Sequence, residues 1–199
     1  MTTYASPRTS PGTIPGYLTG TWDLDPSHSE IGFSVRHLMV SKVRGRFEQF
    51  SGSFVTADRP EDSSVEATID LQSIDTNSPD RDAHLRSADF FHVEEHPTMT
   101  YRSTGIRRDP DGAGFIIDGD LTLRGVTRQV PLELEIEGFG PDPFGGTRAG
   151  FSATGEINRT DFGVSYNGPI PGGGTVVSEK VQISLDVEAV LQTEGQAEG

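Results

Sequence analysis

The chain has 199 residues, with 16 Lys and Arg against 30 Asp and Glu, and a net charge of −14. Nucleic-acid binding needs a basic surface, so this balance argues against that function and against broad adhesion to anionic membranes. Cysteine is absent, which excludes disulfide bonds and a thiol nucleophile. With 33% hydrophobic residues, 24 glycines and 13 prolines, the composition favours one domain of many strands and turns over a helical bundle.

The first 20 residues and the later apolar stretches predict neither a signal peptide nor a membrane span. Residues 1–20 contain three prolines and no apolar run, so they do not predict a signal peptide, and no later stretch is long and apolar enough to span a bilayer. We therefore predict a cytoplasmic protein without stable membrane insertion. Residues 1–20 are predicted to be a disordered or loosely packed arm, with contact through Ile14, Tyr17 and Leu18 as the alternative, and 192–199 a disordered acidic tail.

The first clear strand pattern starts at Ile31. Ile31, Phe33 and Val35 alternate with polar or small residues, which is typical of a half-buried strand. A basic segment follows, and we expect it to be a turn before a second strand that begins at Phe47. Phe47 has the opposite parity to Phe50, which predicts either an outward Phe47 or a β-bulge near Glu48 and Gln49. The basic segment contains His37, Lys42, Arg44 and Arg46.

The middle of the chain predicts one strand and one short helix. Residues 65–71 alternate between apolar and polar side chains, which indicates a strand. Ser78 and Pro79 predict the start of a helix that ends near Ser87, because serine caps helix N-termini and proline suits the first helical position. We expect this helix and the Phe90-Phe91 pair to close one end of the domain, either as a plug or as a lid that contacts a ligand.

Five further strands follow the helix, and with the three strands before it they make a predicted total of eight. Eight is about the number at which a closed barrel encloses side chains or one small ligand, although a two-sheet sandwich gives the same alternation. Pro131 predicts a bulge, a gap or a sheet edge, because proline cannot donate to a ladder. These later strands are predicted at 99–103, 115–123, 130–136, 149–157 and 181–189.

The inward positions of these strands are uncharged, and several are small. Small inward residues either leave an apolar volume for a guest or are matched by large residues opposite. The connection 159–175 is rich in Gly and Pro and longer than most loops, which predicts a gate at the barrel mouth. The small inward residues are Ala67, Gly119, Ala149, Ala153 and Gly155.

A set of short motifs in a fixed order resembles the YceI-like, or polyisoprenoid-binding, family. The match covers about Thr21 to Leu191. Its motifs are Trp22-Asp-Leu-Asp25, His28-Ser29, Phe33-x-Val35-x-His37, Gly45-x-Phe47, Phe50-x-Gly52, Asp70-Leu71, Ser73-Ile-Asp-Thr76, Arg81-Asp82, His84-Leu-Arg-Ser87, Asp89-Phe-Phe91, Pro97, Gly119-Asp-Leu-Thr122, Arg124-Gly125, Ile157-Asn-Arg159 and Asp161-Phe-Gly163.

This resemblance implies an all-β fold, an eight-stranded antiparallel lipocalin-like barrel over residues 21–191 with one short capping helix. It also implies a bound long amphiphile, namely a polyisoprenoid, an isoprenoid quinone or a fatty-acid derivative, which the protein carries or sequesters. We expect the tail to contact Ile31, Phe33, Val35, Phe54, Ile69, Leu85, Phe115, Phe151 and Phe162. We expect the head group near His37, Arg81, Asn158 or Arg159. A homodimer is possible by analogy with such barrels.

Enzyme functions have little support in the sequence. His92-Val-Glu-Glu95-His96 fits the H-x-x-E-H zinc pattern, but Pro97 follows at once and no long amphipathic helix surrounds it. Asp25 to Ser29 is better explained as a turn. We therefore expect no catalytic residues, no metal and no cofactor. The alternatives are a protein-interaction module with a filled barrel and, less favoured, a zinc-dependent enzyme.

Overall fold

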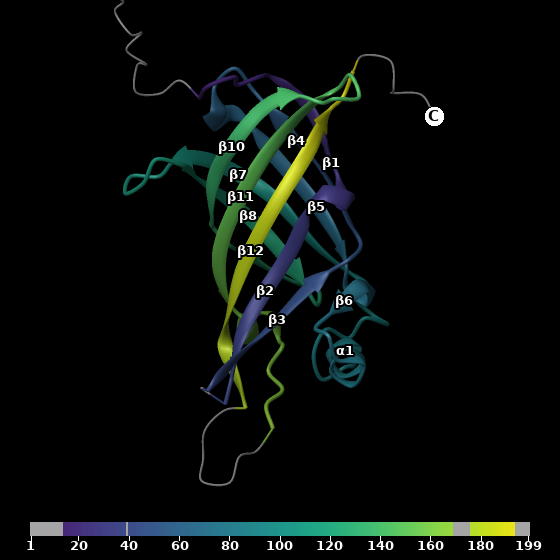
Figure 1. Cartoon of the computed structure of the whole chain (residues 1–199). Coiled ribbons are helices and arrows are strands. Elements are labelled where there is room, and N and C mark those ends of the chain that lie inside the picture. The colour runs from purple at the N-terminus through teal and green to yellow at the C-terminus, as the bar shows by residue number, and fades with distance from the viewer. Residues whose placement is uncertain (1–13, 39, 169–175, 194–199) are drawn as a thin grey trace, which may run out of the picture.

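The computed structural model describes residues 14–38, 40–168 and 176–193, which form one antiparallel sheet of twelve strand segments (Figure 1). The segments are β1 (Gly20–Leu24), β2 (Glu30–His37), β3 (Ser41–Phe47), β4 (Phe50–Thr56), β5 (Ser64–Asp70), β6 (Ile74–Asp75), β7 (Thr98–Arg108), β8 (Phe115–Leu123), β9 (Val126–Gln129), β10 (Leu132–Pro141), β11 (Thr147–Asn158) and β12 (Val177–Leu191). The helices are η1 (Pro26–His28), η2 (Pro60–Asp62), η3 (Leu71–Ser73), α1 (Pro79–Arg86) and η4 (Arg159–Phe162).

The sheet closes on itself, so the predicted barrel is confirmed and the sandwich is excluded. Around the ring, β1, β4, β5, β7, β8, β10, β11 and β12 follow one another, and β1 pairs again with β12. Within the described residues this makes a closed antiparallel barrel of eight strands with one α-helix. Figure 1 shows the long, tilted strands winding around a common axis, with α1 beside one end.

Twelve segments form eight strands because several strands are interrupted. β12 pairs along its length first with β2 and then with β1, so β1 and β2 are two parts of one strand. The break is η1, where the Asp25 carboxylate accepts a hydrogen bond from the Ser27 amide at 3.0 Å and Pro26 removes a ladder donor. β9 and β10 likewise flank Val130 and Pro131 and both pair with β8. Pro131 thus lies in a gap, one of the predicted outcomes.

The prediction of a basic turn after the first strand is wrong. Lys42, Arg44 and Arg46 lie on the outward face of β3, which pairs with β2 from Ile31–Phe47 to His37–Ser41. Alternating basic residues thus follow strand periodicity, with Val43 and Gly45 facing inward. Phe47 is buried, so it does not face outward.

The parity change between Phe47 and Phe50 comes from a break at Glu48 and Gln49. Both amides donate to the Ser73 hydroxyl, at 3.1 and 2.9 Å, instead of to a neighbouring strand. The two extra residues let Phe47 and Phe50 both point into the barrel, since each is less than a tenth exposed. Of the two predicted alternatives, the irregularity near Glu48 and Gln49 has the right position, but it separates β3 from β4.

The helix α1 is held against the barrel by charged side chains that bond to backbone and hydroxyl groups. Asp82 is buried and accepts hydrogen bonds from the Thr76 amide at 2.9 Å and the Thr76 hydroxyl at 2.5 Å. Arg86 donates to the carbonyl oxygens of Gln72 and Ile74, both at 2.9 Å. These bonds fix the helix and the segment after it, which carries Phe90 and Phe91, over one end of the barrel.

The other end of the barrel is filled by aromatic side chains. Trp22 is fully buried, and its indole nitrogen donates to the Thr56 hydroxyl at 2.8 Å. Its ring stacks on Phe54 with centroids 6.0 Å apart and meets the edge of Phe139 at 5.5 Å. Trp22 lies within the barrel domain predicted at 21–191, but alternation did not predict β1 as a strand, because this segment is only five residues long.

Part of the predicted N-terminal arm is packed. Tyr17 donates to the Ala57 carbonyl at 2.8 Å and its ring lies 5.4 Å from Phe139. Residues 14–20 therefore contact the barrel through one of the side chains proposed as the alternative. The predictions for 1–13 and 194–199, and that part of the proposed gate at 169–175, lie outside the described residues.

Candidate functional site: an apolar cavity inside the barrel

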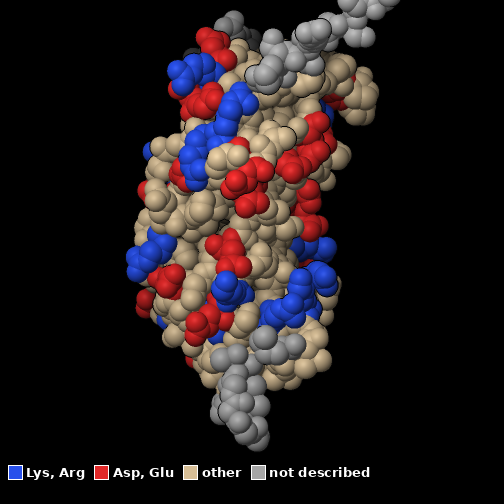
Figure 2. Space-filling model, turned by 90° about the vertical axis from the view of Figure 1, so that its left-hand side faces the viewer, with Lys and Arg blue, Asp and Glu red and all other residues tan. Residues whose placement is uncertain are grey.

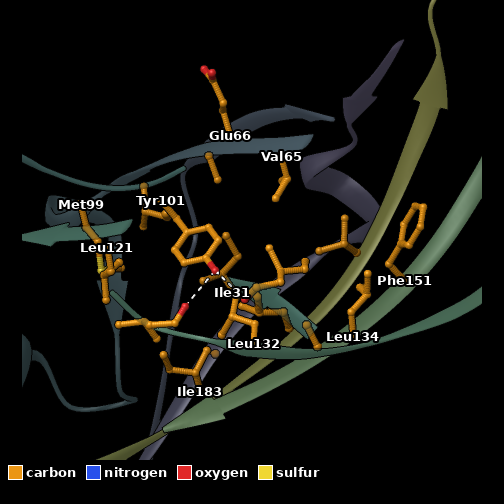
Figure 3. Close-up of a pocket in the computed structure, with 18 of the residues that line it drawn as sticks. Ile31, Val65, Glu66, Met99, Tyr101, Leu121, Leu132, Leu134, Phe151 and Ile183 are labelled. Carbon is orange, nitrogen blue, oxygen red and sulfur yellow. Dashed lines mark hydrogen bonds between the residues drawn. The ribbon is translucent and has the colours of Figure 1, made fainter. Parts of the chain in front are cut away.

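The barrel encloses a cavity with a volume of about 280 Å³. Its wall comes from the inward faces of strands all around the ring and from the segment after α1. Figure 3 shows the side chains of residues far apart in sequence, among them Ile31, Leu132 and Ile183, converging on this space, while Glu66 points away from it. The wall is therefore built mainly from aliphatic and aromatic side chains.

The wall follows from the period-2 alternation of each strand. In β8, the residues with the parity of Phe115 are buried, and those between them are more exposed. The β10–β11 register places Leu134 opposite Ala153, and the β11–β12 register places Ala153 opposite Leu185, so all three share the inner face. A slip of one residue would turn the acidic outer face inward, and this fixes the register.

Tyr101 is a polar group within this apolar wall. Its hydroxyl donates to the carbonyl oxygens of Ile117 and Val130, at 3.2 and 2.9 Å, as Figure 3 shows in part. Burial raises the pKa of the Tyr101 phenol well above its usual value, and the nearby Asp118 and Asp120 raise it further. The hydroxyl is thus neutral and its donor is used within the protein.

The small inward residues do not all mark empty space. A Cβ atom on Gly119 would lie 2.4 Å from the Tyr101 ring, and one on Gly155 would lie 2.6 Å from the Leu132 side chain. Large neighbours therefore occupy both positions, the second of the two predicted possibilities. Ala149 belongs to the filled Trp22 cluster, whereas Ala67 and Ala153 line the cavity.

The structure brings most of the predicted tail-contacting residues together at the cavity. Those in its wall are Ile31, Phe33, Val35, Phe54, Ile69, Leu85, Phe115 and Phe151. Phe162 is the exception: it is 1% exposed and lies in the hydrophobic core at η4, outside the cavity wall. Its parity could not be predicted, because it follows a strand rather than belonging to one. That these residues contact a ligand stays a prediction.

Arg159 is the predicted head-group residue that reaches the cavity wall. It is 5% exposed and donates to four backbone carbonyl oxygens. Its partners are Ser178 at 3.0 Å, Val164 at 2.6 Å, Tyr166 at 3.0 Å and Val177 at 3.2 Å. Among the described residues no carboxylate lies within ion-pair distance of it. Burial lowers the pKa of the Arg159 guanidinium, and the charge of Glu179 opposes this change.

The other three predicted head-group residues lie away from the cavity wall. Arg81 donates from Nε to the Thr76 hydroxyl at 2.8 Å and from Nη2 to the Thr76 carbonyl at 2.6 Å, so it holds α1. The Asn158 side chain caps η4 by accepting from the Thr160 amide at 3.0 Å. His37 ends β2, opposite Val177 and Ser41. The structure therefore does not gather the four residues at one place.

Several wall residues were not named as ligand contacts from the sequence, although the same alternation identifies them. They share the inward parity of their strands: Val65, Ala67, Met99, Tyr101, Ile117, Leu121, Leu132, Leu134, Ala153, Ile183 and Leu185. Phe90, Phe91 and Val164 also line the cavity, but they come from irregular segments. No periodic signal exists for such residues.

Two groups of side chains have the composition of metal sites. His92, Glu95 and His96 bring one ligand atom each to within 4.8 Å of one another, with His92 Nδ1 3.5 Å from a Glu95 oxygen. Asp25, His28 and Glu188 form the second group, but the Arg148 guanidinium already bonds both carboxylates there, Asp25 at 2.7 Å. Arg148 thus pairs with the acids of the second group, whereas among the described residues no Lys or Arg lies within ion-pair distance of Glu95 in the first.

None of the helices in the described residues is long and apolar enough to cross a membrane.

Comparison with known proteins agrees with this fold and this arrangement of residues. Residues 22–189 match the model of the YceI-like domain. The chain is 40% identical over 172 residues to protein YceI of Escherichia coli O17:K52:H18, with 85% of each chain covered.

Solved structures show the same architecture. The YceI protein of Campylobacter jejuni superposes with a TM-score of 0.66 at 28% identity, covering 90% of this chain and 100% of that one. A polyisoprenoid-binding domain from Saccharophagus degradans superposes with a TM-score of 0.64 at 18% identity, covering 86% and 98%. The family model and the Escherichia coli relative together show that this chain belongs to the YceI-like family.

Proposed function

We propose that this protein binds the apolar tail of a long amphiphile in its barrel and carries or sequesters that molecule. The observation that carries the proposal is the cavity of about 280 Å³ with an almost wholly apolar wall. An empty apolar cavity favours an apolar guest over water, because water would lose its hydrogen bonds there. The wall supports binding rather than catalysis, since the Tyr101 hydroxyl and the Arg159 guanidinium in it already bond to backbone carbonyls.

The size of the cavity limits how much of a tail it holds. About 280 Å³ is just below the usual range for small-molecule pockets, which begins at about 300 Å³. Each buried CH2 group contributes about 0.8 kcal/mol, reduced by the cost of ordering the chain. A short prenyl or acyl segment would therefore bind, and the rest of a long chain would extend beyond the cavity.

Arg159 is the side chain best suited to select a head group. A guanidinium has five N–H donors, and four hydrogen bonds from Arg159 to carbonyl oxygens leave one donor on Nη2. A buried cation surrounded by carbonyl dipoles gains most from an anionic or strongly polar partner. We therefore propose a polar or anionic head group at Arg159, and no longer expect His37, Arg81 or Asn158 to act with it.

The named ligand of one structural neighbour supports the same ligand class. The Saccharophagus degradans structure is of a polyisoprenoid-binding domain. A polyisoprenoid, an isoprenoid quinone and a fatty-acid derivative all combine an apolar chain with a polar head. We propose this class for the present chain, without choosing among the three.

Native mass spectrometry of the purified protein, followed by organic extraction, tests the proposal. The expected result is a discrete bound mass that extracts as a prenyl or acyl lipid, or uptake of one equivalent when such a lipid is added. A purely apo mass with no uptake of prenyl lipids, quinones or fatty acids would overturn it. The Phe54→Ala variant serves less well, because Phe54 also stacks on Trp22.

One observation keeps a metal-dependent function as the second candidate. His92, Glu95 and His96 offer two imidazoles and a carboxylate, the ligand set of many zinc sites, although they lie on a turn rather than on a helix. Metal analysis of protein purified without a histidine tag separates the two functions. Stoichiometric zinc that is lost in the His92→Ala/His96→Ala variant would support the second candidate.

A further inference from the structure

The turn between β2 and β3 has two exposed apolar residues next to three exposed cations. Leu38 is 45% exposed and Val40 86%. Arg36 lies at the end of β2, and Lys42 and Arg44 lie on the outer face of β3. We refer to these five residues as the hairpin tip. Its two apolar side chains are exposed beside three basic residues, in a protein whose net charge is −14.

The positions of the three cations lower the stability of the β2–β3 hairpin. Arg36 lies directly opposite Lys42 in the β2–β3 register, and Arg44 is the next outward residue of β3. Like charges directly opposite on a sheet are destabilising. Among the described residues, none of the three lies within ion-pair distance of an acid, whereas Arg46, farther from the turn, contacts both Glu48 and Asp75. This concentration of unpaired positive charge favours an anionic partner.

The hairpin tip lies at an end of the sheet that the cavity reaches. Val35 and Val177 line the cavity and are only partly buried; Val35 lies two residues before His37, and Val177 pairs with His37 across the sheet. The amide of Leu38 donates to the Val176 carbonyl at 2.8 Å, which ties the turn to the start of β12. Figure 1 places the ends of β2 and β3 that flank this turn at the end of the barrel opposite β1, and Figure 2 shows Lys and Arg side chains interspersed with Asp and Glu over one face of the molecule.

We propose that the hairpin tip docks on an anionic lipid bilayer, where the cavity takes up or releases its amphiphile. This inference rests on the proposed function, because it gives the ligand a source. Basic residues near a surface of anionic lipids are attracted to it, and apolar side chains beside them can enter the interfacial region. The acidic remainder of the protein limits adhesion to this one end and keeps it reversible.

Vesicle co-sedimentation tests the proposal, with vesicles of phosphatidylcholine alone and of phosphatidylcholine mixed with phosphatidylglycerol. The protein should bind the mixed vesicles and not the neutral ones, and added salt should weaken binding through screening. The Arg36→Gln/Lys42→Gln/Arg44→Gln variant should bind about a hundredfold more weakly, since each basic residue near the surface contributes about a factor of five. Leu38→Ser/Val40→Ser should bind several times more weakly.

A matched control comes from exposed residues elsewhere on the barrel. Phe144, in the β10–β11 turn, is 93% exposed, and Arg59 is exposed beside Asp62. The Arg59→Gln/Phe144→Ser variant should bind vesicles as the wild type does. Equal binding by all variants, or no preference for anionic vesicles, would overturn the proposal.

Two further readouts separate this inference from the proposed function. Binding of a dissolved fatty acid, measured without vesicles, should be unchanged in the hairpin-tip variants. Failure of fatty-acid binding would therefore count against the cavity as a ligand site, and loss of vesicle binding alone in these variants would count against a docking surface elsewhere. Analytical ultracentrifugation should show no change in oligomeric state. A dimer that the triple variant abolishes, without vesicle binding, would overturn the proposal in favour of an interface between copies.

Discussion

The two ends of this barrel follow the same alternating pattern, yet one is filled and the other encloses a cavity. At the filled end, Trp22 stacks on Phe54 and contacts Phe139, while Ala149 and Ala189 give its ring room. In the rest of the barrel the inward residues are mostly medium-sized aliphatics on opposite walls, and they leave about 280 Å³ free. The size of side chains that meet across the barrel, not the alternation itself, therefore decides where free volume remains.

Ion pairs also hold the filled end of the barrel together. Arg148, three-quarters buried, bonds to Asp25 and Asp142, both at 2.7 Å, and to Glu188. These four residues come from the turn before η1, the β10–β11 connection and two adjacent strands, so they tie together segments distant in sequence. The cavity half has Arg159 instead, whose partners are carbonyl oxygens. One cation is thus paired with carboxylates, and the other is held by backbone carbonyl oxygens.

The largest expected effect contrasts an aromatic residue at the filled end with an aliphatic one in the cavity wall. Trp22→Ala should lower the free energy of unfolding by about 3–5 kcal/mol, because it opens a void in a packed cluster. Leu134→Ala should cost about 1 kcal/mol, since the Leu134 side chain already borders empty space. Urea unfolding measures both. Equal costs would show that the cavity half is packed as tightly as the filled end.

The Arg159→Met variant removes the buried cation of the cavity half. We expect a loss of about 2 kcal/mol or more, because several buried carbonyl oxygens lose their donor. The control is Arg128→Met on the exposed face of β9, which should change stability by no more than about 0.5 kcal/mol. Urea unfolding of the two variants decides. If both behave alike, Arg159 does not organise the β11–β12 connection.

Tyr101→Phe removes the hydroxyl in the cavity wall and should cost about 1 kcal/mol. Burial raises the pKa of the Tyr101 phenol, so its contribution to stability is present below the usual tyrosine pKa of about 10 and is lost as the pH rises above it. Urea midpoints measured across this alkaline range should fall more steeply for the wild type than for Tyr101→Phe. Parallel curves would contradict the assignment. Uptake of an apolar ligand should be unchanged.

The smallest expected effect is the loss of stability at acidic pH that comes from Asp25 at the filled end. Hydrogen bonds from Ser27 and then from Arg148 hold the pKa of Asp25 well below its usual range. Its contribution is therefore present above the usual Asp pKa of about 4 and is lost as the pH falls below that value. The urea midpoint of the wild type should fall on acidification, and that of Asp25→Asn should start lower and fall less. An unchanged slope in the variant would show that Asp25 does not titrate with folding.

Alternation within the strands predicted their inward and outward faces and part of the cavity wall, whereas the closed barrel was predicted from the family resemblance, because a sandwich shows the same alternation. These inferences failed where geometry depends on a break or on a partner far away. The basic residues of β3 looked like a turn, since Lys42 and Arg44 face solvent on a strand with few large apolar residues. Arg81 looked available for a head group, but its donors are used by Thr76, five residues earlier.

The cavity itself could not be predicted from the sequence, for a physical reason. Gly119 and Ala153 have the same inward parity, but Tyr101 covers the first and nothing comparable fills the second. Which side chains meet depends on shear and register between strands that are distant in sequence. Pairwise packing across the barrel, rather than residue size at one position, sets the free volume.

The central claim is tested most directly by titrating a fluorescent fatty acid, such as cis-parinaric acid, into the wild type and two matched variants. Ala153→Phe adds a ring to the cavity wall, and Thr154→Phe adds the same ring to the outer face of the same strand. We predict saturable binding at about one equivalent, weakened at least about tenfold by Ala153→Phe and unaffected by Thr154→Phe. Binding that both variants retain equally would contradict the cavity as the ligand site.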